Sequence, residues 1–174
     1  MKYTSSFGCR AHTDRVGVLM AQLGTPDAPT PSALRRYLKQ FLADRRVIEV
    51  NRILWWCILN GIILRVRPAR SAKLYARIWG EDGSPLLRIT EQQTEKLKAR
   101  FDPYTTQFEF GMRYGNPSLE SALDKLINGG CSRIVLVPLY PQYAAATSAS
   151  VYDAVFPHLL KRRWVPTVRV VEPF

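Results

Sequence analysis

Two short stretches of the sequence carry side chains that could bind a flat, carboxylated ligand. Arg113 and Tyr114 are adjacent. An arginine can pair with a carboxylate through two parallel hydrogen bonds, and a tyrosine can stack and hydrogen-bond. Tyr140 and Tyr143 precede a run of small residues and would form an aromatic wall with room beside it. The plainer alternative for Arg113 and Tyr114 is a helix-entry turn with a solvated arginine. For Tyr140 and Tyr143 it is packing of both side chains in the core.

A third stretch is both basic and aromatic. Arg65, Arg67 and Arg70 precede Tyr75, and Gly83-Ser84-Pro85 follows. Clustered arginines suit carboxylates or phosphates, although a solvated basic face would need no ligand. Taken together, the three stretches describe a basic, aromatic-walled cleft for a planar, carboxylated ligand.

The glycine in Leu23-Gly24-Thr25-Pro26-Asp27 could let the backbone approach a ligand closely, or could belong to a phosphate-binding loop. The patterns G-x-G-x-x-G and G-x-x-x-x-G-K-[ST] are both absent from the sequence, so nucleotide binding has little support. A plain strand-to-loop turn is the alternative.

Composition is consistent with one globular domain of 174 residues, 47% of them hydrophobic and 22% charged. The net charge of +11 favours anionic partners, but no nucleic-acid recognition motif is present, so we expect no nucleic-acid partner. Cys9, Cys57 and Cys131 form no C-x-x-C pair. We therefore expect a reducing, cytoplasmic location, with neither a disulfide framework nor a metal site in this chain.

The elements that must position these residues alternate between strand and helix. Short, β-branched, apolar runs predict buried parallel strands over residues 16–23, 107–112, 133–139 and 167–171. Helix signals fall between them: Thr30-Pro31 opens a helix to residue 43, and a capping box at Thr90 opens one to residue 100. Asn116-Pro117 opens a helix that closes at Gly129-Gly130, and Thr147 or Ser148 caps a last helix to about residue 163.

This alternation predicts an α/β fold, a doubly wound parallel four-stranded sheet flanked by helices. We expect residues 1–15 to be a loose lead-in and residues 16–174 to form the domain. In such sheets ligands bind beyond the carboxyl ends of the strands. The residues that follow the strands, at 23–26, 113–117 and 140–143, are therefore the expected functional ones.

Residues 53–64 form an apolar run that contains Trp55-Trp56 and is bracketed by Arg52, Arg65 and Arg67. The run is shorter than the roughly 20 residues of a membrane-spanning helix and is interrupted by Asn60-Gly61, so spanning is excluded. It fits a helix that lies on a membrane surface or lines an apolar cleft. A buried core helix is the alternative.

Read in order, these motifs resemble the ferrochelatase family, whose members insert ferrous iron into a porphyrin to make haem. The resemblance runs from about residue 16 to residue 143, through the segments 17–30, 35–47, 83–86, 112–117 and 138–143. It implies two similar α/β halves with a porphyrin cleft between them. This chain resembles the first half.

The resemblance also assigns site residues. It places Leu23 close to the metal centre of the porphyrin, Arg113 and Tyr114 in the active site, and the 53–64 segment at an apolar lip that can touch a membrane. It implies protoporphyrin IX and ferrous iron as substrates, with walls that bend the macrocycle and arginines that hold its propionates. The further substrate-binding positions are Arg67, Tyr75 and Ser84, with Tyr143 added from the aromatic wall.

The family's proton-abstracting base is a histidine in an H-G-x-P-like motif, which works with a glutamate in the second half. His12 and His158, the histidines of this sequence, match neither position. Ala145 stands where some members place an iron–sulfur cysteine, so we expect no cluster. We therefore expect no catalytic residue in this chain and no metal insertion by the chain alone. A non-catalytic half-domain that binds porphyrin or haem is the alternative.

Overall fold

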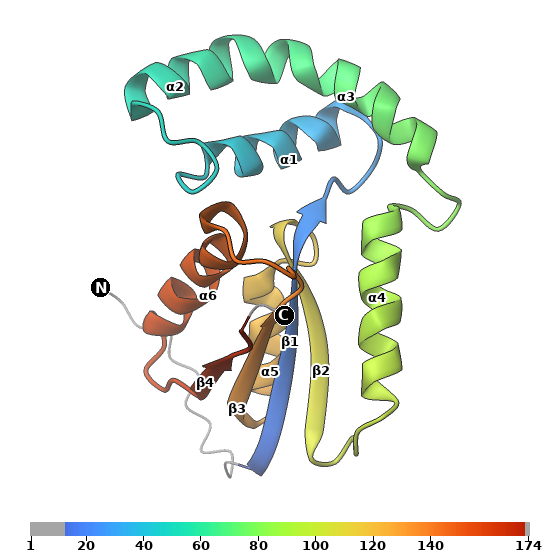
Figure 1. Ribbon diagram of the computed structural model, residues 1–174, viewed down its shortest axis with the longest axis vertical. Coiled ribbons are helices and arrows are strands. Elements are labelled where there is room, and N and C mark those ends of the chain that lie inside the picture. Colours follow the sequence, from blue (N-terminus) through green and yellow to red (C-terminus); the bar gives the residue numbers. More distant parts are fainter. Residues whose placement is uncertain (1–12, 173–174) are drawn as a thin grey trace.

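A computed structural model describes residues 13–172 of the chain (Figure 1). Four strands pair in parallel, in the order β2-β1-β3-β4. The strands are β1 (Thr13–Thr25), β2 (Thr106–Gly115), β3 (Cys131–Pro138) and β4 (Thr167–Val170). The helices are α1 (Pro31–Ala43), α2 (Arg52–Ile58), α3 (Leu64–Ile78), α4 (Pro85–Lys98), α5 (Leu119–Asn128) and α6 (Ser150–Leu160), with π-helical turns η1 (Leu59–Ile63) and η2 (Ala145–Ala149).

Helices cover both faces of this sheet, which confirms the predicted α/β architecture. In the sheet, β2 lies on one side of β1 and β3 lies on the other. The connection from β1 to β2 therefore runs in one direction across the sheet, and the connection from β2 to β3 runs back in the opposite direction. Right-handed crossovers in opposite directions place their helices on opposite faces. Accordingly α4 lies on one face, and α5 and α6 lie on the other (Figure 1).

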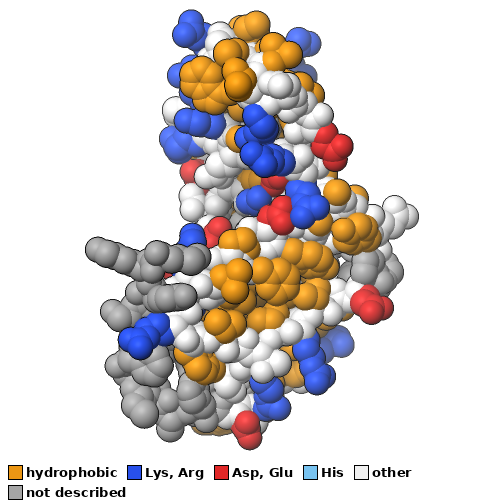
Figure 2. Space-filling view, turned by 90° about the vertical axis from the view of Figure 1, so that its left-hand side faces the viewer, with side chains coloured by type: hydrophobic (Ala, Val, Ile, Leu, Met, Phe, Trp, Pro, Cys, Tyr) orange, Lys and Arg blue, Asp and Glu red, His pale blue; other side chains and the backbone are white. Residues whose placement is uncertain are grey.

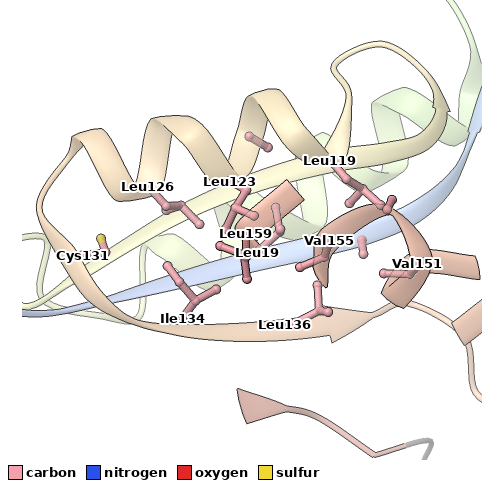
Figure 3. Packing of buried hydrophobic residues seen from close by; sticks show 13 residues of the cluster. Leu19, Leu119, Leu123, Leu126, Cys131, Ile134, Leu136, Val151, Val155 and Leu159 are labelled. Carbon is pink, nitrogen blue, oxygen red and sulfur yellow. The ribbon is translucent and has the colours of Figure 1, made fainter. Parts of the chain in front are cut away.

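The main core fills the space between the sheet and the pair α5 and α6. Helical spacing of three or four residues turns one apolar stripe of each helix toward the strands, as Figure 3 shows. The side chains that meet there are Leu119, Leu123 and Leu126 of α5, Val151, Val155 and Leu159 of α6, and Leu19, Ile134 and Leu136 of the strands.

A second core lies beyond the carboxyl ends of β1 and β2. There α1 packs beneath the long arch formed by α2, η1 and α3 (Figure 1). Its buried members include Leu34, Tyr37 and Leu38 of α1, Leu64 of α3, and Tyr114 from the end of β2. The arch is therefore attached to the strand ends through α1 and Tyr114.

The predicted strands are confirmed, with ends displaced by a few residues. β1 begins at Thr13, so residues 13–15 of the expected lead-in belong to the strand. The rest of that lead-in, residues 1–12, lies outside the described part of the chain. β2 runs on to Gly115, past Arg113 and Tyr114. These two residues therefore belong to the end of the strand rather than to a loop.

Helix α1 begins as predicted, with Pro31 first and the Thr30 hydroxyl accepting the Ala33 N–H. The predicted start at Thr90 is wrong, because α4 already begins at Pro85. Gly83, with φ +102°, makes the preceding turn, and Pro85 has the fixed φ that suits a first helical position. Thr90 is buried within the helix, and its hydroxyl donates to the Leu86 carbonyl over 2.8 Å.

The starts of α5 and α6 also differ from the prediction. α5 begins at Leu119, because Ser118, rather than Asn116, caps it: the Ser118 hydroxyl accepts the N–H of Ser121 in the first turn. The last helix opens with η2, in which the Thr147 hydroxyl accepts the Ala144 N–H over 3.1 Å. It ends at Leu160 rather than near residue 163.

The apolar segment 53–64 forms α2 and η1. No residue of α2 is buried, and Ile53 and Trp56 are 79% and 65% exposed. The alternative of a buried core helix is therefore wrong for α2. Trp55 anchors the helix to α1, since its indole N–H donates to the Leu42 carbonyl over 2.7 Å. No helix between residues 13 and 172 is long and apolar enough to cross a membrane.

Candidate functional site

At the carboxyl ends of β1 and β2 there is no room for a side chain at Gly24. Gly24 pairs with Tyr114 in the register of the two strands and has φ +109°. A Cβ at Gly24 would lie 1.8 Å from the Tyr114 carbonyl oxygen, so no other residue fits without moving the backbone. The close approach that Gly24 permits is therefore to the neighbouring strand.

A buried carboxylate, Asp44, gathers the polar side chains at this edge. It directly follows α1 and its side chain is only 7% exposed. Its Oδ2 accepts from Arg113 Nη2 over 2.6 Å, from the Tyr114 hydroxyl over 2.7 Å and from the Ser150 hydroxyl over 2.7 Å. Its Oδ1 accepts the Arg46 N–H over 2.7 Å. We call Asp44, Arg113, Tyr114 and Ser150 the Asp44 cluster.

Arg113 makes further contacts within this cluster. Its Nε donates to both the carbonyl and the hydroxyl oxygen of Ser150, each over 2.7 Å. Its guanidinium carbon lies 4.7 Å from the ring centroid of Tyr114, which permits a cation–π contact. The cluster therefore joins the end of α1, the end of β2 and the start of α6.

The protonation states in the cluster follow from these contacts. Burial alone would raise the pKa of Asp44, but hydrogen bonds from Ser150, Tyr114 and the Arg46 N–H, together with the charge of Arg113, outweigh it. The pKa of Asp44 is accordingly held below its ordinary value. Burial raises the pKa of Tyr114 to about 12. At neutral pH the carboxylate is ionised and the phenol keeps its proton. The negative charge of Asp44 is therefore paired with the positive charge of Arg113, and Tyr114 donates its hydrogen bond to the same carboxylate.

The arch carries a hollow of about 500 Å³ on η1 and α3. Its lining combines apolar side chains with two arginines and one hydroxyl: Ile62, Ile63, Val66, Arg67, Arg70, Ser71 and Leu74. Among the described residues, Arg67 and Arg70 form no ion pair with a carboxylate. Such a surface suits a ligand that is largely apolar and carries carboxylates at one edge.

The remaining predicted site residues lie in several places. Leu23 and Tyr75 are half-buried against the second core. Ser84 is buried, and its Oγ accepts a 2.8 Å hydrogen bond from the Thr25 hydroxyl, which links the start of α4 to the end of β1. Tyr143 is 60% exposed. The structure thus brings Arg113 and Tyr114 together and places Arg67 in the hollow.

The tyrosine that precedes Tyr143 along the same loop, Tyr140, packs against the main core. Its buried hydroxyl has no hydrogen-bond partner within the described residues. Burial raises the pKa of this phenol, so it also keeps its proton at neutral pH. The two tyrosines therefore differ in surroundings, one packed and one open.

Sequence reasoning missed Asp44 and Ser150. Asp44 stands in Ala43-Asp44-Arg45-Arg46, which reads as an ordinary charged stretch after a helix. One signal was present: an acidic residue at the carboxyl end of a helix opposes the helix dipole, so it needs a partner elsewhere. That partner, Arg113, is 69 residues away in sequence.

The arch carries several exposed apolar side chains. Figure 2 shows hydrophobic side chains at the top of the molecule, over the arch, with Lys and Arg near them, and a further hydrophobic patch below the arch. Leu54, Ile62 and Val66 are 55%, 61% and 67% exposed. A monomeric protein seldom leaves such a surface uncovered unless it binds something apolar.

Comparison with known proteins gives one consistent family. The family model described as Ferrochelatase matches residues 15–174. The ferrochelatase of Thioalkalivibrio sulfidiphilus is 54% identical over 162 residues, which cover 91% of this chain and 44% of that protein. The ferrochelatase of Pectobacterium atrosepticum is 50% identical over 161 residues, covering 92% and 50%. The chain therefore spans about half the length of the curated relatives it matches.

Proposed function

Since the chain belongs to the ferrochelatase family, we propose that it forms the first half of an enzyme that inserts ferrous iron into protoporphyrin IX to give protohaem. The observation that carries the proposal is the hollow of the arch, in which Arg67 and Arg70 stand beside four apolar side chains. Protoporphyrin has the matching chemistry, a flat apolar ring with two propionates at one edge.

The substrate-binding roles that we propose are the following. Arg67 of the hollow is proposed to pair with a propionate. Tyr75, half-buried against the second core, and the buried Ser84 are proposed to support the porphyrin site. Leu23, Arg113 and Tyr114, at the ends of the strands, are proposed to line the side of the site nearest the metal, with Tyr114 acting from its buried position through its bond to Asp44. The exposed Tyr143 is proposed to contact the macrocycle. Rigid apolar and aromatic walls of this kind can hold the macrocycle bent, so that its nitrogens point toward the incoming ion.

We further propose that the base that takes the two pyrrole protons is not among these 174 residues. Neither histidine stands in an H-G-x-P sequence, and His12 lies outside the described residues. His158 is bonded through Nε2 to Asp124 over 2.6 Å, between α6 and α5. Asp44 is ionised but already accepts four hydrogen bonds, so it has little capacity left for a proton.

Binding and turnover separate the two parts of this proposal. We expect residues 1–174 to bind protoporphyrin IX, measured by quenching of tryptophan fluorescence, and to insert no zinc, measured by the fluorescence of zinc protoporphyrin. Fusion to the remaining half of the Thioalkalivibrio sulfidiphilus ferrochelatase should give zinc insertion. Absence of both binding and fusion activity would refute the family function for this chain. Binding without activity in the fusion would instead support a non-catalytic porphyrin-binding half-domain.

A peripheral membrane contact of a cytoplasmic enzyme is part of the same proposal. Trp56 and Ile53 project from α2, and Arg52 and Arg65 flank the apolar segment. An apolar helix face with basic ends binds anionic interfaces and would take up an apolar substrate from the membrane surface. Flotation with vesicles that contain anionic lipid tests this contact.

A further inference from the structure

The Asp44 cluster contains a buried carboxylate in a place that is unfavourable for one. Asp44 follows the carboxyl end of α1, where the helix dipole disfavours a negative charge, and is 7% exposed. Burial of a carboxylate is costly unless the charge is paired and its hydrogen bonds are satisfied. Here both conditions are met, through Arg113 and three further donors.

Arg113 differs from the arginines of the hollow in its ion pairing. It is bound to Asp44 over 2.6 Å and is itself 20% exposed. Arg67 and Arg70, in contrast, form no ion pair among residues 13–172 and line the hollow on α3. Within the described part of the chain, therefore, the two arginines of the hollow have no ion pair, whereas the charge of Arg113 at the strand ends is neutralised by Asp44.

We propose that Asp44 is a positioning residue that keeps the wall of Arg113 and Tyr114 electrically neutral toward the divalent metal substrate. The inference rests on the proposed function, because it takes the strand ends to face the metal. Without Asp44, the guanidinium would stand uncompensated in a chain whose net charge is already +11. One such charge about 6 Å from a dication weakens its binding about tenfold even at the dielectric constant of water.

Three variants of the fusion enzyme test the proposal, with zinc as the metal. Asp44→Asn should raise the KM for zinc about tenfold or more, while the KM for protoporphyrin changes less than about twofold. The double variant Asp44→Asn with Arg113→Gln removes both charges, and its KM for zinc should fall at least about threefold below that of Asp44→Asn, whatever the change in kcat. A residue that served the fold alone would lower the melting temperature of the fusion without a selective rise in the KM for zinc, so the melting temperature of each variant is measured as well.

Asp153→Asn is the matched control. Asp153 also pairs with an arginine, Arg46, over 2.8 Å, but both side chains are exposed, and the change in net charge is the same. Its KM for zinc should remain at the wild-type value. A rise equal to that of Asp44→Asn would mean that overall charge, rather than the wall, is responsible, and would overturn the proposal.

The remaining outcomes also decide the matter. If the wild-type fusion is active and Asp44→Asn leaves the KM for zinc unchanged, the inference fails and the proposed function stands. If the wild-type fusion neither binds porphyrin nor inserts zinc, both fail. If Asp44→Asn is too unstable to assay, Arg113→Gln is compared with the double variant: the unpaired carboxylate of Asp44 should give Arg113→Gln the lower KM for zinc, and equal values would overturn the proposal.

Discussion

Replacement of Gly24 by alanine should be one of the most damaging single changes at the strand ends. The new Cβ would lie 1.8 Å from the carbonyl oxygen of Tyr114, and the residue would also have to keep φ +109°. Backbone strain of this kind costs about 1–3 kcal/mol. The clash adds to it, because a backbone oxygen cannot rotate away as a side chain can. We expect a total loss of about 4 kcal/mol or more in the free energy of unfolding.

Gly83→Ala provides the matched control for that prediction. Gly83 has almost the same φ, +102°, but a Cβ there would meet nothing within 4 Å. It should therefore lose only the strain, about 1–2 kcal/mol. For a protein of this size the melting temperature should fall by about 10 °C or more for Gly24→Ala and by about 5 °C for Gly83→Ala. Thermal and urea unfolding followed by circular dichroism measure both, and equal losses would refute the assignment of the close strand contact.

Three further predictions concern the core, the arch and the buried carboxylate. Leu123→Ala, at a fully buried position of α5, should cost about 2–5 kcal/mol in urea unfolding, whereas Leu160→Ala, at a position 65% exposed, should cost under about 0.5 kcal/mol. Trp56→Ala should reduce flotation with anionic vesicles while leaving the melting temperature unchanged, because the indole is 65% exposed. Since the folded-state pKa of Asp44 is lowered, its stabilisation is present above the unfolded pKa of about 3.9 and is lost as the pH falls through the folded value. Asp44→Asn should therefore flatten the acid side of the stability–pH profile measured by urea unfolding.

The strands were predictable because their signal is local and strong. A run such as 133–139 is apolar on both faces, and the pattern leaves few alternatives to a buried parallel strand. The helix starts were less predictable, since several residues near each start can cap. At Thr90 the capping-box pattern competed with Pro85 five residues earlier, and proline with its preceding turn determined the start.

The candidate site was predictable only where its residues follow a strand. Arg113 and Tyr114 stand at such a position, and their adjacency is visible in the sequence. The function of Arg113 within the cluster was not visible, because its contacts come from Asp44 and Ser150, 69 and 37 residues away. Pairing across such separations depends on how α1 and α6 approach the sheet, and no local pattern encodes that approach.

The arch differs from the rest of the domain in what its apolar residues do. Leu123 and its neighbours are closed off by the sheet, whereas Trp56 and Ile53 face outward from a helix that is held in place by the hydrogen bond of Trp55 to Leu42. The exposed surface is therefore already ordered before anything binds to it. A preformed surface spares a ligand the entropy of ordering its site. Under the proposed function, the binding energy of the porphyrin can then go into bending the macrocycle, which is the step that metal insertion requires.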